Sequence, residues 1–236
     1  MYLKKNRYKP IFKKLIKLRE NIQNRYKILK FKKNKWKIFL KIYQNKIKKF
    51  KPLDQFKYYL NKYIAKKTSY NKRFKDTLQA GTKLRIFYGS LLKKYLKKQI
   101  KLTLEKRKLR LKMENTLLHF LESRLDTILY RAKFATTIKS AQQLISHGKI
   151  YINQTQIKNK TYNVKSGDII TVNLNYLNIY ENCIINSIKW PIPPKYLLIN
   201  YRTFQILILD SINSTNIANQ FLFNLNLQKI LINYYK

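Results

Sequence analysis

The chain has 236 residues, of which 52 are lysine or arginine and 10 are aspartate or glutamate, so its formal net charge is +42 at pH 7. A compact fold with this excess repels itself and needs an acidic partner, either nucleic acid or an anionic membrane surface. One cysteine excludes a disulfide framework and a thiolate zinc cluster, and no run of about 20 apolar residues offers a membrane span.

The positive charge is concentrated in the first half of the chain. Residues 1–112 hold 39 of the 52 basic residues and 4 of the 10 acidic ones. Lysine, asparagine, isoleucine, tyrosine and phenylalanine are abundant while glycine occurs only 4 times, a bias typical of A/T-rich genomes such as those of organelles. The dense lysine- and tyrosine-rich start also differs from a cleavable transit peptide. We therefore expect a product made inside an organelle.

Residues 1–51 alternate basic side chains with apolar ones. The segments "IFKKLIKLRENI" and "WKIFLKIYQNKIKKF" have apolar residues at close to helical spacing. Because little opposes their lysine repulsion, we expect a disordered basic tail in the free protein, with helices forming when phosphates neutralise the lysines.

Residues 75–112 predict a strongly amphipathic helix. Leu91, Leu92, Tyr95, Leu96, Ile100 and Leu104 recur at steps of three and four, and lysine pairs at 93/94 and 97/98 fill the opposite side. Glu105 is the only acidic residue between 83 and 112, so the lysine face predicts an anionic partner rather than a salt-bridged surface.

The stretch "SRLDTILYRAKFATTIKSAQQLISHGKIYINQ" at 123–154 predicts two short capped helices and a hairpin. We expect Ser123 to cap the first helix, with Asp126 at the capping-box position, and Thr136 or Thr137 to cap the second. Gly148 fits the left-handed residue that ends a helix. "KIYIN" and "QTQIKN" then predict a hairpin, and "VKSGDIITVNL" another strand.

Basic and polar side chains of this helix pair are expected to share one exposed surface. They are Arg124, Arg131, Lys139, Gln143, His147 and Lys149. Guanidinium and ammonium groups suit phosphates, and glutamine and histidine can hydrogen-bond sugar or base edges. Further along, "KYLLINYRTFQILIL" predicts one or two buried strands, and "LNLQKILINYYK" a terminal helix.

These segments resemble the small-subunit ribosomal protein S4 family. The resemblance is carried by "LLHFLESRLDTILYRAKFATTIKSAQQLISHGKIYINQ" with "VKSGDII", by "KLRIFYGSLLKKY" upstream, and more weakly by "YLLINYRT" and "LNLQKILINYYK". It implies an α+β fold in which an RNA-binding module, two helices packed on a small antiparallel sheet, is inserted into a helical lobe. The domains expected are a basic extension at 1–74, the first part of the helical lobe at 75–115, the module at 116–178, and a segment at 179–236 that packs back on the lobe.

The resemblance also implies a function and a set of contacts. A family member binds small-subunit rRNA, helps to fold it during assembly, contacts neighbouring ribosomal proteins and lies near the mRNA entry path and the decoding region. We expect no catalytic residue, cofactor or metal, and a mitochondrial rather than a plastid ribosome. The residues expected to bind RNA are Lys83, Arg85, Tyr88, Arg124, Arg131, Lys133, Thr137, Lys139, Gln143, His147 and Lys149.

The chain departs from the family pattern at two turns. Lys133 follows the first module helix where the family usually has glycine, and Asn153-Gln154 stands where Asn-Gly is frequent. Both turns are expected to be reshaped, or to reflect the bias against glycine codons.

An enzyme is the alternative, because the same module occurs in RNA pseudouridine synthases. "RLD" at 124–126 is similar to their catalytic motif, in which the aspartate is the nucleophile. The position of Asp126 in the first turn of a predicted helix favours a capping role, and about 60 residues after the module are too few for the catalytic domain of those enzymes.

Overall fold

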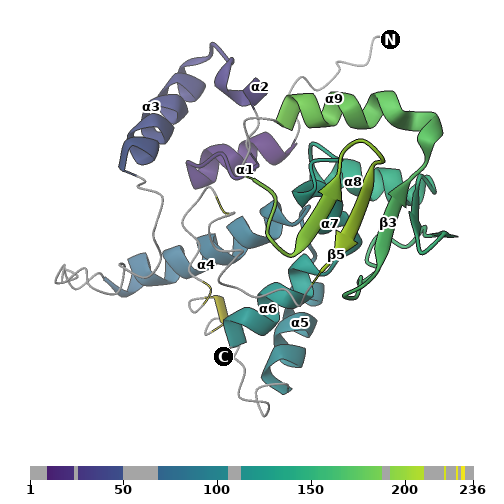
Figure 1. The fold of residues 1–236 in the computed structure, drawn as a ribbon. Helices are drawn as coiled ribbons and strands as arrows, with labels where there is room; N and C mark the ends of the chain where they lie inside the picture. Colours follow the sequence, from purple (N-terminus) through teal and green to yellow (C-terminus); the bar gives the residue numbers. More distant parts are fainter. Residues whose placement is uncertain are drawn as a thin grey trace, which may run out of the picture.

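The computed structural model describes residues 10–23, 26–49, 69–105, 113–187 and 192–209, together with Phe221, Leu227, Ile230 and Leu231. These residues form a helical lobe and a module of helices on an antiparallel sheet (Figure 1). The expectation of a terminal helix falls mostly on residues outside the described ranges. Leu227, Ile230 and Leu231 are helical, and the last two are buried, as the terminal helix requires.

The helical lobe holds the basic part of the chain. Its helices are α1 (Pro10–Leu18), α2 (Tyr26–Leu29), α3 (Asn34–Lys49), α4 (Tyr70–Phe87), α5 (Lys93–Glu105) and α6 (Met113–Glu122). The amphipathic helices expected at 11–22, 36–50 and 91–104 are thus present as α1, α3 and α5. Arg19, with a φ of 54°, ends α1 earlier than the apolar stripe alone indicates.

Residues 10–23 and 26–49 pack around an aromatic core, so the expectation of a disordered tail is wrong for these residues. Trp36 is 1% exposed, and its ring centroid lies 4.9 Å from that of Phe31 and 5.7 Å from that of Phe39. The segment also docks on α4, because Glu20 pairs with Lys83 at 2.7 Å and Gln23 Nε2 donates to the Ile86 carbonyl. The lysine repulsion is overcome because the apolar stripes are buried together while the lysines stay in water.

The module contains two helices and a five-stranded sheet. Its elements are α7 (Leu125–Arg131), α8 (Ile138–Ser146), β1 (Ile150–Ile152), β2 (Thr155–Gln156), β3 (Ile169–Val172), the 3-10 helix η3 (Leu174–Tyr176), α9 (Leu177–Ser187), β4 (Leu197–Asn200) and β5 (Gln205–Ile208). All strand pairs are antiparallel, in the order β2-β1-β3-β5-β4. The expected hairpin and the strand after the Gly-Asp turn are confirmed. Helix α9 was not expected, because its isoleucine- and asparagine-rich sequence has low helix propensity.

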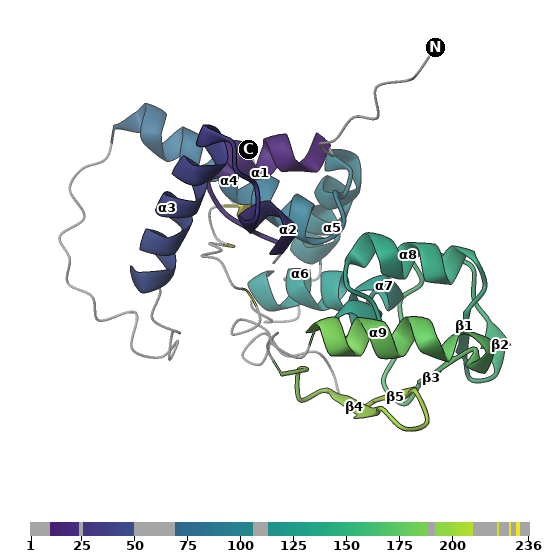
Figure 2. The ribbon, with the colours of Figure 1, turned by 90° about the horizontal axis from the view of Figure 1, so that it is seen from above.

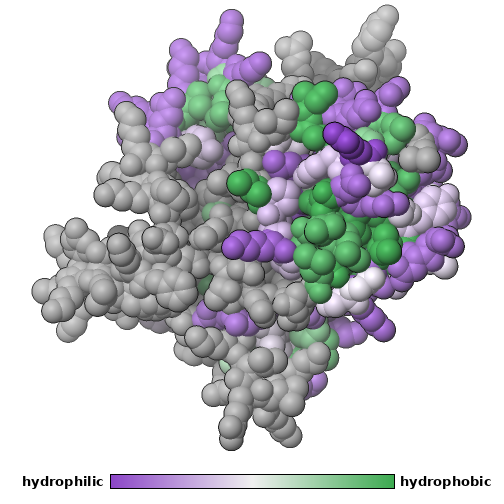
Figure 3. Space-filling view, in the orientation of Figure 1, coloured by the Kyte–Doolittle hydropathy of each residue, from purple (hydrophilic) through white to green (hydrophobic). Residues whose placement is uncertain are grey.

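Alternation along the strands divides the sheet into two faces. Ile150, Ile170 and Ile206 are fully buried on the inner face, which α7 and α8 cover (Figure 2). The outer face carries Ile169 and Leu198, which are about half exposed, and apolar atoms gather over it in the space-filling view (Figure 3). A sheet covered on one side only accounts for this inner and outer division.

Strands β4 and β5 correct the expected arrangement of the carboxyl-terminal segment. Residues 179–236 were expected to pack back on the helical lobe, whereas β5 pairs with β3 and β4 with β5, which extends the sheet of the module. Phe221 does contact the lobe, with its ring centroid 5.1 Å from that of Phe87. The boundaries expected after residues 74, 115 and 178 also fall inside α4, α6 and α9.

A buried carboxylate joins the lobe to the module. Glu122, the last residue of α6, is fully buried and forms a two-bonded ion pair with Arg131 at the end of α7, with Arg131 Nη2 2.6 Å from Oε1 and Nε 3.0 Å from Oε2. Tyr88 donates its hydroxyl to Oε1 at 2.6 Å, and Tyr196 donates to Oε2 at 3.3 Å. The end of α4, the end of α6, α7 and the residue before β4 therefore meet at one side chain.

The protonation states of the groups in this cluster match the hydrogen bonds that they form. Burial, and next the Glu122 charge, raise the pKa of Tyr88 and Tyr196 well above the ordinary value, so both stay protonated donors. Burial alone would lower the pKa of Arg131, but the Glu122 carboxylate raises it above its ordinary value. The Arg131 guanidinium also lies 5.2 Å from the Phe87 ring centroid and 5.3 Å from that of Phe221, a cation–π arrangement.

Glu122→Gln tests this junction. The substitution leaves the Arg131 charge buried without a counter-ion, which costs about 3–5 kcal/mol of unfolding free energy. Urea unfolding followed by circular dichroism measures the loss. Glu114→Gln, on the same helix but only half-buried, is the matched control and should change stability by no more than about 0.5 kcal/mol. Equal effects of the two substitutions would contradict the role given to Glu122.

Trp36→Ala tests whether the amino-terminal helices form a packed unit. Removing a buried indole should cost about 3–5 kcal/mol, measured in the same way. Ile38→Ala is the control, because Ile38 lies on the same helix and is 61% exposed. A Trp36 variant as stable as the control would mean that residues 10–49 are not packed.

Candidate nucleic-acid interface

The outer face of α8 presents polar side chains at regular spacing. Ile138, Ala141, Leu144 and Ile145 are buried, and the other side of the helix faces solvent. The exposed residues there are Lys139, Gln143, Ser146 and His147. The exposure predicted for this part of the surface is confirmed. The helix places one cation, one amide and one imidazole on its solvent side within three turns.

The ends of α8 are fixed by local hydrogen bonds. Thr137, one of the two expected caps, accepts from the Ser140 backbone N–H at 3.1 Å. This N–H is in the first turn, where no carbonyl of the helix can accept its hydrogen bond. Gly148 ends the helix with a φ of 66°, and an added Cβ would meet Gln156 Nε2 at 2.5 Å. Both expectations for this helix are confirmed.

The start of α7 differs from the expectation. Its N-cap is Arg124 rather than Ser123, with no side-chain cap, and Asp126 is not in a capping box. Leu125 N–H donates to the Tyr162 carbonyl, and Val164 N–H to the Ser123 carbonyl. Residues 162–164 thus hold the helix start by backbone pairing, which a local sequence pattern does not reveal.

Arg124 is not on the surface, so its expected exposure is wrong. The side chain is 2% exposed and donates from Nε and Nη2 to both carboxylate oxygens of Asp126, at 3.0 and 2.6 Å. Gln142 Nε2 also donates to Asp126 Oδ2, and the guanidinium lies 5.2 Å from the Tyr95 ring centroid. The adjacent carboxylate neutralises the guanidinium charge, while Nη1 is buried without a hydrogen-bond partner. Through Asp126 and Tyr95, Arg124 links the start of α7 to α8 and α5.

Arg131 and Tyr88 are also buried, in the Glu122 cluster described above. The sequence spacing correctly placed Arg124 and Arg131 on similar sides of α7, but that side faces the helical lobe. With only ten acidic residues in the chain, an intramolecular counter-ion for each was not expected. These two arginines therefore do not share the exposed surface with Lys139.

The remaining predicted residues vary in accessibility. Lys83 is paired with Glu20, and half-buried Arg85 donates from Nε to the Leu91 carbonyl at 2.8 Å. Half-buried Lys133 has a φ of 68°, the conformation for which the family uses glycine, and burial lowers its pKa. Lys149 Nζ lies 3.5 Å from the Tyr176 ring centroid. Of the expected set, Lys139, Gln143 and His147 are the fully exposed members.

The hairpin adds a basic residue that sequence reasoning missed. Asn153 and Gln154 form its turn with positive φ values of 46° and 67°. The turn therefore keeps the backbone conformation that glycine usually adopts, although neither residue is glycine. The side chain of exposed Lys158 passes next to Gly148, with Cε 3.5 Å from an added Cβ. The sequence "TQIK" could have indicated this residue, because Lys158 follows the return strand of the hairpin, near the end of α8.

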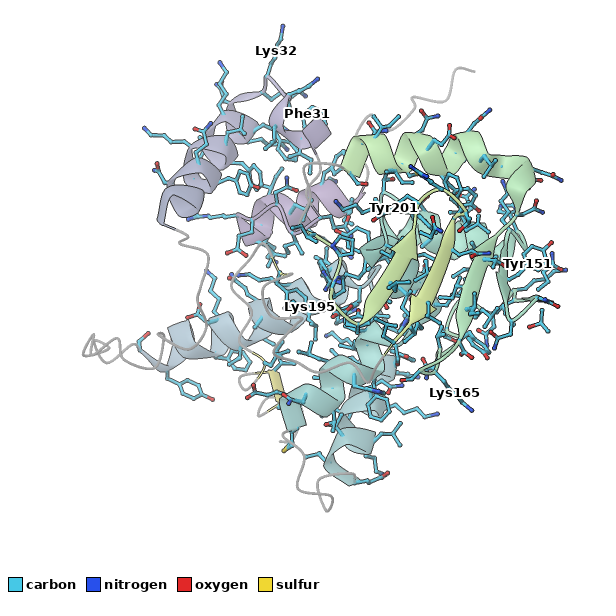
Figure 4. The ribbon with its side chains drawn as sticks, viewed as in Figure 1. Phe31, Lys32, Tyr151, Lys165, Lys195 and Tyr201 are labelled. Carbon is cyan, nitrogen blue, oxygen red and sulfur yellow. The ribbon has the colours of Figure 1, made fainter. Side chains whose placement is uncertain are left out.

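The helical lobe adds an extended basic surface. The exposed lysines include Lys13, Lys14 and Lys17 on α1, Lys35, Lys37 and Lys41 on α3, and Lys93, Lys94, Lys97 and Lys98 on α5. Lys32 points away from the molecule, whereas Phe31 beside it faces the helices (Figure 4). The basic faces expected for these helices are confirmed as exposed.

Two kinds of feature are absent from the described part of the chain. Among those residues, no group of three or more histidine, cysteine, aspartate or glutamate side chains is arranged to hold a metal ion. Within the same ranges, no helix has the length and apolar character needed to cross a membrane.

Comparison with known proteins identifies both the module and the chain. The S4 domain model matches residues 123–170, which contain α7, α8 and β1–β2 and reach into β3. The small ribosomal subunit protein uS4m of Marchantia polymorpha is 34% identical over 150 residues, which are 61% of this chain and 72% of that protein.

Bacterial relatives match over a shorter segment. Small ribosomal subunit protein uS4 of Sphingopyxis alaskensis is 40% identical over 95 residues, and that of Paracoccus denitrificans is 33% identical over 99 residues. These segments are 40% and 42% of this chain and only 45% and 47% of the bacterial proteins. The Marchantia match covers more than two thirds of the relative, so the chain belongs to the small ribosomal subunit protein uS4 family.

Proposed function

We propose that the chain is a structural component of the small ribosomal subunit that binds small-subunit rRNA. The observation that carries the proposal is the rigid, exposed polar face of α8 on a matched S4 domain. A face with fixed donor spacing can select a folded RNA, because RNA helices are distinguished by shape and by backbone and sugar contacts. Lys139 suits a phosphate, and Gln143 and His147 suit ribose or base edges.

The lobe and the module are proposed to contribute differently. The lysines of α1, α3 and α5 neutralise phosphates of any RNA, which adds affinity without sequence information. The α8 face and Lys158 provide selection of the site. Because residues 10–49 dock on α4, deleting them would damage the lobe, and lysine-to-glutamine substitutions on α3 are the cleaner way to reduce affinity for all RNAs together.

The finer assignments follow from family membership. The protein is proposed to bind early, to help fold the rRNA during assembly, to contact neighbouring ribosomal proteins and to lie near the mRNA entry path and the decoding region. Its compartment is proposed to be the mitochondrion, supported by the uS4m relative and by the long basic extension, while the amino-acid bias supports an organelle in general. A plastid ribosome is the alternative location.

A binding protein is favoured over a pseudouridine synthase by the state of Asp126. Its carboxylate is fully buried, and both oxygens accept hydrogen bonds from Arg124, with a third from Gln142. A nucleophile must reach the substrate base, and this one is enclosed between helices. Incubation with a model rRNA, followed by analysis for uridine isomerisation, tests this choice, and any turnover would contradict the binding-protein proposal.

The affinity for small-subunit rRNA should fall steeply with salt. Each neutralised phosphate contributes about −0.9 to the slope of log K against log salt for B-form DNA, so a slope steeper than about −4 is expected for an interface of several lysines. Filter binding between low and physiological salt measures it. A flat affinity over that range would contradict an electrostatic interface.

Substitution of the α8 face should reduce selective binding. Lys139→Ala with Gln143→Ala removes a charge-assisted hydrogen bond worth about 1.5–3 kcal/mol and an amide contact, so affinity for the cognate RNA should fall at least about tenfold. Binding to unstructured RNA, driven by the lobe, should change little. Competition binding with cognate and random RNA gives both values, and circular dichroism confirms the fold.

The matched control is Arg202→Ala with Thr203→Ala. It removes one cation and one polar side chain from the exposed turn between β4 and β5, away from α8. Cognate affinity should stay within about threefold. Equal losses for the two double variants would mean that α8 contributes charge alone and does not select the RNA.

A further inference from the structure

The outer face of the sheet exposes a row of aliphatic side chains. The strand register places Ile169 of β3 opposite Leu207 of β5, and Leu207 opposite Leu198 of β4. Ile169 is 46% exposed and Leu198 55%, and Leu209, on the same face beyond β5, is 52% exposed. Single exposed aliphatic residues are ordinary, but a contiguous patch on a protein surface marks an interaction site.

The patch faces away from the proposed RNA-binding surface. Helices α7 and α8 cover the inner face of the sheet, and the strands lie on the opposite side of the module (Figure 2). The space-filling view shows apolar atoms over β5 and its neighbours, with hydrophilic atoms around them (Figure 3). The module therefore has two separate exposed faces of different chemistry.

Two lysines flank one end of the aliphatic row. Lys165 precedes the turn in which Gly167 N–H donates to the Ile208 carbonyl, and Lys195 lies two residues before Leu197, which pairs with Ile208. Both are exposed, and they lie on either side of the end of β5 (Figure 4). The nearby carboxylate of Asp168 is already engaged, because it accepts from Asn153 Nδ2 and from the Lys165 backbone N–H. The charge of this rim is positive.

The side chains of the row favour a protein over RNA. Branched aliphatic groups cannot stack on bases or hydrogen-bond to phosphate and ribose, which are the means by which proteins bind single-stranded nucleic acid. Tyr151 of β1 is opposite Thr171 of β3 and so shares the outer face, but it lies on the hairpin side of the row, and Tyr201 lies at the β4–β5 turn with its ring centroid 6.1 Å from that of buried Phe134 (Figure 4). Burial of aliphatic area against another apolar surface is the interaction that this face offers.

We propose that the outer sheet face docks a second protein through an apolar segment flanked by acidic residues. The aliphatic row of Ile169, Leu198 and Leu207 contacts the apolar side chains, and Lys165 and Lys195 attract the acidic flank and set its orientation. The inference rests on the proposed function in one respect, because it places this partner beside the chain in the small ribosomal subunit.

Site-specific cross-linking in assembled subunits tests the proposal. Cys183 is the only cysteine, so Cys183→Ser with Leu198→Cys gives one thiol on the row, to be labelled with a benzophenone maleimide. The labelled full chain is added to small subunits reconstituted from the rRNA and remaining proteins of the source organism, irradiated and analysed by mass spectrometry. The result expected is a cross-link to a protein segment with apolar residues beside aspartate or glutamate.

Two comparisons make the result specific. Lys139→Cys in the same background labels the α8 face and should cross-link to rRNA. Lys165→Glu with Lys195→Glu, added to the Leu198→Cys chain, should lower the protein cross-link by about threefold or more, because two attractive charges become repulsive.

The possible failures are distinguishable. If the labelled Leu198→Cys chain enters the small subunit but cross-links to rRNA, or gives no cross-link, the docking face is contradicted and the proposed function is not. A protein cross-link that the two glutamate substitutions leave unchanged contradicts the acidic character of the partner. Absence of the labelled chain from the small-subunit fraction contradicts the proposed function and, with it, this inference.

Discussion

The buried carboxylate of Glu122 is the constraint on which the arrangement of the molecule depends. It accepts hydrogen bonds from Arg131, Tyr88 and Tyr196, which come from two helical segments and from the start of the carboxyl-terminal strands. An isolated buried carboxylate would be strongly unfavourable, but here a guanidinium and two hydroxyls satisfy it. Because directional bonds to one group fix several segments at once, the module is held at a defined orientation on the helical lobe.

This constraint separates scaffold from binding surface. Arg124 and Arg131 are the two arginines of the module helices, and both are used inside the protein, where Asp126 and Glu122 neutralise them. The planar guanidinium suits such bidentate buried pairs, whereas lysine is a hydrated point charge that remains in solvent. The proposed RNA contacts accordingly come from lysine, glutamine and histidine on α8, and the proposed protein contact comes from the outer sheet face.

Much of the fold could be predicted from local patterns in the sequence. The periodicity of α1, α3 and α5, the Thr137 cap, the Gly148 helix end and the alternation in β1 and β3 are all short-range signals, and they were confirmed. Patterns of this kind do not show which part of the protein each face of a helix or strand contacts. Arg124 and Arg131 were placed in solvent because periodicity gives the direction of a side chain but not its neighbour, and the counter-ion of Arg131 lies on another helix. The pairing of β5 with β3 and the aromatic core of residues 10–49 likewise depend on contacts between distant residues.

The division between buried scaffold and exposed binding face can be tested at Arg131 itself. Arg131→Met combined with Glu122→Gln removes both buried charges, while the glutamine oxygen can still accept from one of the two tyrosines and the amide NH2 can donate to the hydroxyl oxygen of the other. The measurement is the affinity of the double variant for small-subunit rRNA, with circular dichroism to verify the fold. We predict a folded protein whose cognate affinity stays within about threefold of the original chain. A folded variant that binds cognate RNA at least about tenfold more weakly would contradict the account, because Arg131 would then contact the RNA.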